Sequence, residues 1–132
     1  MTQRLAVTSP DAPPALGPYS QAMIHSGLVW CSGQLGLDPI SGELVDGGVE
    51  AQAVQALKNL QAVCAAAGTS LDQAIRCTIY LTDLADFATV NRCYAAVLRE
   101  PFPARACVQV AALPKGGVVE IDAVVPLATS AN

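Results

Sequence analysis

The stretch that decides the fold is residues 49–68, VEAQAVQALKNLQAVCAAAG, followed by residues 75–81, IRCTIYL. In the first stretch apolar residues recur every three or four positions, which is typical of an amphipathic helix. The residues that show this spacing are Ala53, Leu57, Leu60 and Cys64. Gly68 follows as a favoured helix stop, and in residues 75–81 the apolar period falls to two. The sequence therefore predicts a helix that leads into a strand.

The same patterns extend in both directions along the chain. Residues 19–26 and 28–32 are two β-rich runs that meet at Gly27, which predicts a hairpin. The strand after the first helix is predicted over residues 71–81. A second helical pattern covers about residues 85–99.

Near the C-terminal end the sequence predicts a second hairpin. Residues 105–112 and 118–127 are β-rich, and the turn formers of residues 113–117 separate them. The predicted order is β-β-α-β-α-β-β in a single domain over residues 1–132. Two helices between strands most economically cover one face of a single mixed β-sheet, so we expect an α/β (α+β) fold with both helices on one side.

Composition narrows the possible partners. The chain has seven basic and eleven acidic residues, a net charge of −4 and no basic run, which disfavours nucleic acid as the main partner. It is 52% hydrophobic and only 14% charged, so we expect apolar surface to be buried between subunits on the second face of the sheet. The five cysteines are isolated from one another, and neither a metal site nor a disulfide framework is expected.

The same sequence indicates the compartment. No apolar run reaches the roughly 18 residues that a membrane helix needs, and residues 1–5 lack the apolar region of a secretion signal. We therefore expect a cytoplasmic protein with free thiols and no membrane partner.

One arginine in an otherwise apolar strand is the first candidate for chemistry. Arg105 shares a strand face with Cys107 and Gln109, and Glu120 shares a face with Asp122. A partly buried guanidinium needs an anion, so Arg105 is either half of a structural ion pair or a clamp for a substrate carboxylate. Glu120 is either half of a structural ion pair, with Arg105 or a lysine, or a group that takes part in the chemistry.

The predicted hairpin implies a geometry for these groups. If Leu113 pairs with Val118, then Glu120 lies opposite Ala111 and faces the same side as Arg105. Even so, Ala111 is about 13 Å along the strand from Cys107, at roughly 3.3 Å per residue. A site that uses all three polar groups would therefore need two chains, and we expect it to lie between subunits.

Several segments together carry a family resemblance. They are Gly17-Pro18-Tyr19-Ser20-Gln21-Ala22, Ser32-Gly33-Gln34-Leu35, Asp86-Phe87-Ala88-Thr89-Val90-Asn91, Pro103-Ala104-Arg105 with Cys107, and Glu120-Ile121. In these segments, and over about residues 16–125, the chain resembles the RidA (YjgF) family, the reactive intermediate deaminases. The resemblance implies a chorismate mutase-like fold, a homotrimer and ligand sites in the clefts between subunits.

The resemblance also implies an activity and roles for residues. The activity is hydrolysis of enamines and imines, such as 2-aminoacrylate and 2-iminopropanoate, to a 2-oxo acid and ammonia, with no metal or organic cofactor. Such an enzyme is a 2-iminobutanoate/2-iminopropanoate deaminase. Arg105 would grip the carboxylate of the 2-imino acid, and Glu120 would position the attacking water. The expected substrate-binding residues are Tyr19, Ser32, Asn91 and Cys107, with Cys107 in a non-covalent role.

Two other functions remain open at this point. One is a non-catalytic small-ligand-binding or chaperone-like trimer, whose activity should survive Arg105→Ala. The other is a deaminase dedicated to one pathway imine. The chain also departs from the family pattern at Ala106, Gln109 and Asp122, where serine, glutamate and glutamate are common. These departures put substrate preference and rate in question more than the class of reaction.

Overall fold

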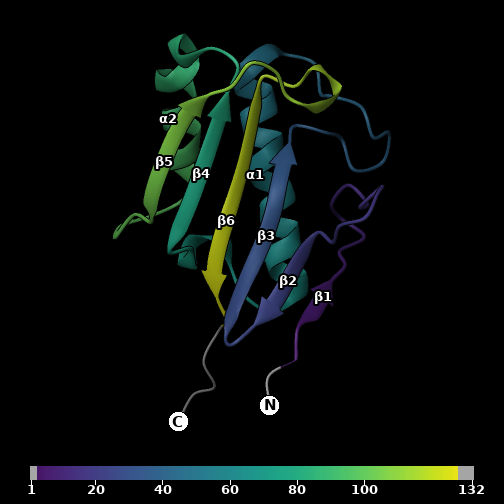
Figure 1. Ribbon diagram of the computed structural model, residues 1–132. Helices are drawn as coiled ribbons and strands as arrows, with labels where there is room; N and C mark the ends of the chain where they lie inside the picture. Colours follow the sequence, from purple (N-terminus) through teal and green to yellow (C-terminus); the bar gives the residue numbers. More distant parts are fainter. Residues whose placement is uncertain (1–2, 128–132) are drawn as a thin grey trace.

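The computed structural model describes residues 3–127 and contains one mixed six-stranded sheet covered on one side by two helices (Figure 1). The strands are β1 (Leu5–Val7), β2 (Ala22–His25), β3 (Leu28–Leu35), β4 (Arg76–Leu81), β5 (Ala104–Gln109) and β6 (Val119–Pro126); the helices are α1 (Gly48–Ala67) and α2 (Phe87–Val97). The strand order in the sheet is β1-β2-β3-β6-β4-β5, with β4 and β5 parallel and every other pair antiparallel. The predicted fold class is confirmed, and β1 is an additional strand at the edge.

The long helix ends where the sequence predicted. Gly68 has a φ of 87°, in the left-handed region that glycine adopts without strain. The Gly68 and Thr69 amides donate to the carbonyls of Ala65 and Cys64, which satisfies two carbonyls at the end of α1. The next strand starts later than expected, because residues 71–73 form the 3₁₀ turn η1 (Leu71–Gln73) before β4 begins at Arg76.

Helix α2 is shorter than predicted at both ends. A 3₁₀ turn, η2 (Leu84–Asp86), precedes it, and the Asp83 carboxylate accepts a hydrogen bond from the Ala85 amide at 2.9 Å. The helix stops at Val97 because Leu98 already has an extended backbone conformation.

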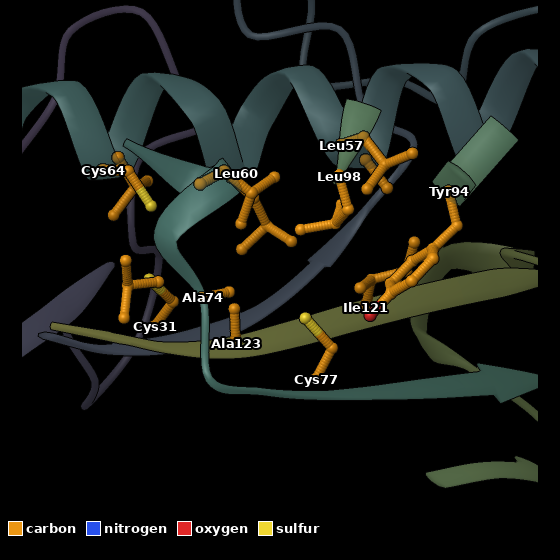
Figure 2. Packing of buried hydrophobic residues seen from close by; sticks show 14 of the residues in the cluster. Cys31, Leu57, Leu60, Cys64, Ala74, Cys77, Tyr94, Leu98, Ile121 and Ala123 are labelled. Carbon is orange, nitrogen blue, oxygen red and sulfur yellow. The ribbon is translucent and has the colours of Figure 1, made fainter. Parts of the chain in front are cut away.

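The hydrophobic core lies between the sheet and the two helices (Figure 2). Alternate residues of β6 point into this core, as the period of two requires. They are Val119, Ile121, Ala123 and Val125. Helix α1 contributes Leu57, Leu60 and Cys64 from above the sheet. Cys31, Cys64 and Cys77 are free, buried thiols of this core.

The second predicted hairpin is wrong. Strand β4 lies between β5 and β6, so these two consecutive strands are not neighbours. Their connection passes across the end of β4: the Val110 amide donates to the Leu81 carbonyl, and the Thr82 amide donates to the Val118 carbonyl. The turn formers of residues 113–117 do make a turn, η3 (Pro114–Gly116), but it belongs to this crossover.

Within residues 3–127 no helix or strand covers the second face of the sheet. Trp30 of β3 and Val108 of β5 project from it and are 52% and 43% exposed. In the part of the chain that the structure describes, neither helix is long and apolar enough to cross a membrane.

Candidate functional site

Arg105 lies on the helix-covered face of the sheet and reaches α2. Its Nη1 donates to Asn91 Oδ1 at 2.7 Å. The central carbon of its guanidinium lies 5.3 Å from the centre of the Phe87 ring and 5.0 Å from that of Tyr94, within cation–π range. Among residues 3–127 it makes no ion pair with a carboxylate. A charged guanidinium is thus held by three neutral side chains.

Glu120 lies on the opposite, open face of the sheet. It is opposite Tyr80 of β4, whereas its neighbour Ile121 points into the core. Partial burial raises the pKa of the Glu120 carboxyl, and the negative charge of Asp122 raises it further. A carboxyl with a raised pKa on a sheet surface is suited to accept and return a proton.

The expectation that Arg105 and Glu120 face the same side is therefore wrong. Cys77 of β4 pairs with Arg105 on one side and with Ala123 on the other, which puts these three side chains on one face. Glu120 is an odd number of residues from Ala123 along β6, so it faces the other way. The predicted pairing of β5 with β6 gave the wrong face because β4 separates them.

A β-bulge in β3 makes room for Glu120. The register between β3 and β6 shifts between Cys31 and Gln34, at Ser32 and Gly33. A Cβ at Gly33 would meet the Glu120 carboxylate, with Cδ at 2.8 Å and Cγ at 3.1 Å. The glycine at the bulge is thus required by the position of the carboxylate rather than by its own backbone angles.

The same bulge holds the segment that carries Tyr19. Ser32 Oγ donates to the Ser20 carbonyl at 2.6 Å, and the Ser32 amide donates to the Gln21 carbonyl at 3.0 Å. The Tyr19 side chain remains 56% exposed at this position. Its ring is therefore available to a ligand beside Glu120.

Tyr19, Ser32, Gly33 and Glu120 line one groove, with a volume of about 740 Å³. Most of the other lining side chains are apolar. They include Pro13, Pro14, Leu16, Leu35, Leu37, Pro39, Ile40 and Pro114. Among the described residues Lys115 is the only cation of the lining, and its Nζ donates to the Gly42 carbonyl at 3.2 Å.

Cys107 follows Arg105 on the same face of β5 and is partly buried. Burial raises the pKa of its thiol, and the positive charge of Arg105 opposes this effect more weakly. The thiol form is therefore favoured over the nucleophilic thiolate. Among residues 3–127 no group of three or more His, Cys, Asp or Glu side chains is arranged to hold a metal.

The structure thus places the predicted site residues in two separate clusters, with Cys107 on the same strand face as Arg105 in the first. We call the first, Arg105 with Asn91, the arginine half-site, and the second, Tyr19, Ser32 and Glu120, the glutamate half-site. Sequence reasoning assigned no role in the site to Phe87 or Tyr94. Their spacing is the signal that could have identified them: Phe87, Asn91 and Tyr94 stand at positions i, i+4 and i+7, and so lie on one face of the helix.

Two of the residues that depart from the family pattern have structural contacts. Gln109 Oε1 accepts a hydrogen bond from the Leu84 amide at 2.9 Å, which ties β5 to the turn before α2. Asp122 accepts from the Thr78 amide and from the Tyr80 hydroxyl, both at 3.0 Å. The negative charge of Asp122 also raises the pKa of the Glu120 carboxyl.

Comparison with known proteins gives a consistent result. The family model described as endoribonuclease L-PSP matches residues 9–127. The RutC family protein y4sK of Sinorhizobium fredii is 51% identical, covering 92% of this chain and 96% of its own. The human 2-iminobutanoate/2-iminopropanoate deaminase is 47% identical, covering 96% and 95% respectively.

Solved structures share the fold over the same length. RidA from the Antarctic bacterium Psychrobacter superposes with a TM-score of 0.89 at 50% identity, covering 93% of this chain and 99% of that one. E. coli TdcF, solved with bound serine, gives a TM-score of 0.87 at 37% identity, covering 94% and 99%.

Proposed function

Because the chain belongs to the endoribonuclease L-PSP family, the RidA (YjgF) family, we propose that it hydrolyses small 2-imino acids to 2-oxo acids and ammonia. The observation that carries the proposal is Arg105: within residues 3–127 its only hydrogen bond goes to a neutral amide, and no carboxylate neutralises it. Relatives named 2-iminobutanoate/2-iminopropanoate deaminase support it, as does a relative solved with an amino acid bound.

In this proposal Arg105 binds the carboxylate of the substrate. An arginine has five N–H donors, and the contact with Asn91 uses a single oxygen acceptor. Enough donors remain for a two-point contact with a carboxylate, which fixes the orientation of the C=N bond as well as its position.

In this proposal Glu120 acts as the general base and then as the general acid. As the water oxygen bonds to the imine carbon, Glu120 takes a proton from the water and passes it to the imine nitrogen, giving a neutral carbinolamine. Glu120 then takes the proton of the carbinolamine hydroxyl as the C=O bond forms and the C–N bond breaks, and it gives that proton to the departing nitrogen, which leaves as ammonia. One water is consumed, one ammonia is released, and no group changes its oxidation state.

These two residues lie on opposite faces of one protomer, so the reaction needs them from different protomers. We propose that the arginine half-site of one subunit meets the glutamate half-site of the next in a closed homotrimer. The uncovered sheet face, with exposed Trp30 and Val108, supports such an assembly. The substrate would then bind in the cleft between subunits.

RNA cleavage, which the name of the family suggests, fits this chain less well. The net charge of −4 and the mostly apolar lining of the groove offer little to a phosphate backbone. A small planar substrate with one carboxylate fits both half-sites.

The test is hydrolysis of 2-iminopropanoate generated in situ by an amino acid oxidase. Wild type should accelerate it, and Arg105→Ala should lower kcat/KM by about 100-fold or more, because a charge-assisted two-point contact is lost. Arg105→Lys keeps the charge but not the planar fork, and we expect it to recover only part of the loss. Absence of acceleration by wild type, with a 2-oxo acid still bound, would make the protein a binding module.

A further inference from the structure

Three side chains on one face of α2 surround the Arg105 guanidinium. Phe87, Asn91 and Tyr94 stand at positions i, i+4 and i+7, so they follow one another along the helix surface. Two of them present ring faces at 5.3 Å and 5.0 Å from the centre of the guanidinium, and the third accepts its hydrogen bond at 2.7 Å. One helix therefore provides every contact described above for the charged end of Arg105.

All three of these side chains are neutral. Ring faces attract a cation and replace part of its lost hydration, and an amide oxygen accepts one N–H. An acidic residue in the same place would hold the guanidinium more strongly but would compete with any carboxylate that approaches it. The described chain uses an acid elsewhere, in the ion pair between Arg99 and Asp72 at 3.1 Å.

Tyr94 contacts Arg105 through its ring and not through its hydroxyl. It is only 3% exposed, and its hydroxyl lies beside the Cys77 thiol without a hydrogen bond in the described part of the chain (Figure 2). A buried hydroxyl without a partner adds no contact to Arg105. The ring, which faces the guanidinium, makes the useful interaction.

We propose that Phe87, Asn91 and Tyr94 are positioning residues that fix the Arg105 guanidinium while leaving its charge free for the substrate carboxylate. This inference rests on the proposed function for its substrate, a 2-imino acid. It assigns to Asn91 an action through Arg105, whereas the family resemblance suggested that Asn91 lines the cleft. It also gives two ring residues a part in substrate affinity.

The sharpest test is Asn91→Asp, which keeps the size of the side chain and strengthens its bond to Arg105. The added charge should neutralise the guanidinium, so we expect 2-oxobutanoate, the product of 2-iminobutanoate hydrolysis, to bind about 10-fold to 100-fold more weakly in calorimetry. KM for the imine should rise with kcat changed less. Ala88→Asp adds the same charge on an exposed position of α2 and is the matched control.

The rings are tested by replacing Phe87, which is 36% exposed and so is not a core residue whose loss would unfold the protein. Phe87→Leu keeps an apolar side chain but removes one ring face, and it should weaken 2-oxobutanoate binding about 3-fold to 30-fold. Phe87→Tyr restores a ring and should restore most of the affinity. A purely structural role would give equal affinities for the two variants at equal thermal stability.

The outcomes separate this inference from the proposed function. If wild type binds 2-oxobutanoate but hydrolyses no imine, the deaminase proposal fails, and the Asn91→Asp and Phe87→Leu affinities still decide the role of the helix. If Asn91→Asp binds the oxo acid as tightly as wild type, the inference is overturned. It is also overturned if wild type shows no affinity for the oxo acid, because Arg105 would then hold no carboxylate.

Discussion

Arg105 and Glu120 lie on opposite faces of the same sheet, separated by β4. No rearrangement of side chains within one protomer can bring the guanidinium and the carboxylate to a common small substrate. If both act on one molecule, they come from two subunits, and this requirement can be tested directly.

Mixed oligomers test whether the two residues act from different chains. Arg105→Ala and Glu120→Gln should each have a kcat/KM lower by about 100-fold or more when assembled alone. Unfolded together and reassembled in equal amounts, they should recover about one quarter of the wild-type sites, because a cyclic trimer pairs each arginine with the glutamate of the next subunit. Recovery of imine hydrolysis is the measurement. A site contained in one chain predicts no recovery, and separately reassembled variants serve as the control.

Gly33→Ala should damage the site with little effect on the fold. The new Cβ would meet the end of the Glu120 side chain, which can swing away, so we expect kcat to fall about 10-fold to 100-fold as the proton-transfer group is displaced. Thermal unfolding should change by only a few degrees. These two measurements together identify Gly33 as a residue that the carboxylate requires.

Gly36→Ala is the matched control for this variant. A Cβ at Gly36 would meet the backbone of Gln52 in α1, at 2.5 Å from Cα and 2.6 Å from the carbonyl oxygen. Backbone cannot move aside as a carboxylate can, so this variant should lose thermal stability markedly. Equal losses of stability in the two variants would contradict the distinction.

Asp122→Asn should shift the pH dependence of the reaction. The Asp122 charge helps raise the pKa of Glu120, so removing that charge should lower the pKa. The base form of Glu120 would then persist to lower pH, and the acidic limb of the kcat/KM profile should move to lower pH. Asparagine keeps an oxygen that can accept from the Thr78 amide. An unmoved limb would show that another group titrates there.

Cys107→Ala should lower kcat/KM by less than about tenfold, because a partly buried thiol with a raised pKa is not an effective nucleophile. Slow alkylation of Cys107 by iodoacetamide at neutral pH, read by mass spectrometry, is the companion measurement. Complete loss of activity in the alanine variant, with folding intact, would instead indicate covalent catalysis.

The features that the sequence predicted correctly are those set by residues close together in the chain. The apolar spacing of α1 and its Gly68 stop are local signals, and the structure confirms both. The alternation of β6 was also correct, since each residue of a strand faces opposite to the next. Arg105 and Glu120 are recognisable as polar residues of otherwise apolar strands, and the family motifs add expected roles for both.

What the sequence did not predict depends on which strands become neighbours. The turn formers of residues 113–117 favour a turn but carry no information about whether the strands on either side pair. The answer depends on β4, about 30 residues earlier in the chain, which takes the place beside both β5 and β6. Because β6 pairs with β4 and not with β5, Glu120 faces the side of the sheet opposite to Arg105. The ring contacts of Phe87 and Tyr94 with Arg105 likewise require the packing of α2 on the sheet.

The central place of β6 also has a consequence for how the protein is made. This strand is the last of the sheet to be synthesised, yet it alone joins the β1–β3 hairpin layer to the β4–β5 pair. A nascent chain that stops before Val119 holds two unconnected groups of strands and an unfinished core. Residues 119–126 must therefore be synthesised before the six strands can form one continuous sheet.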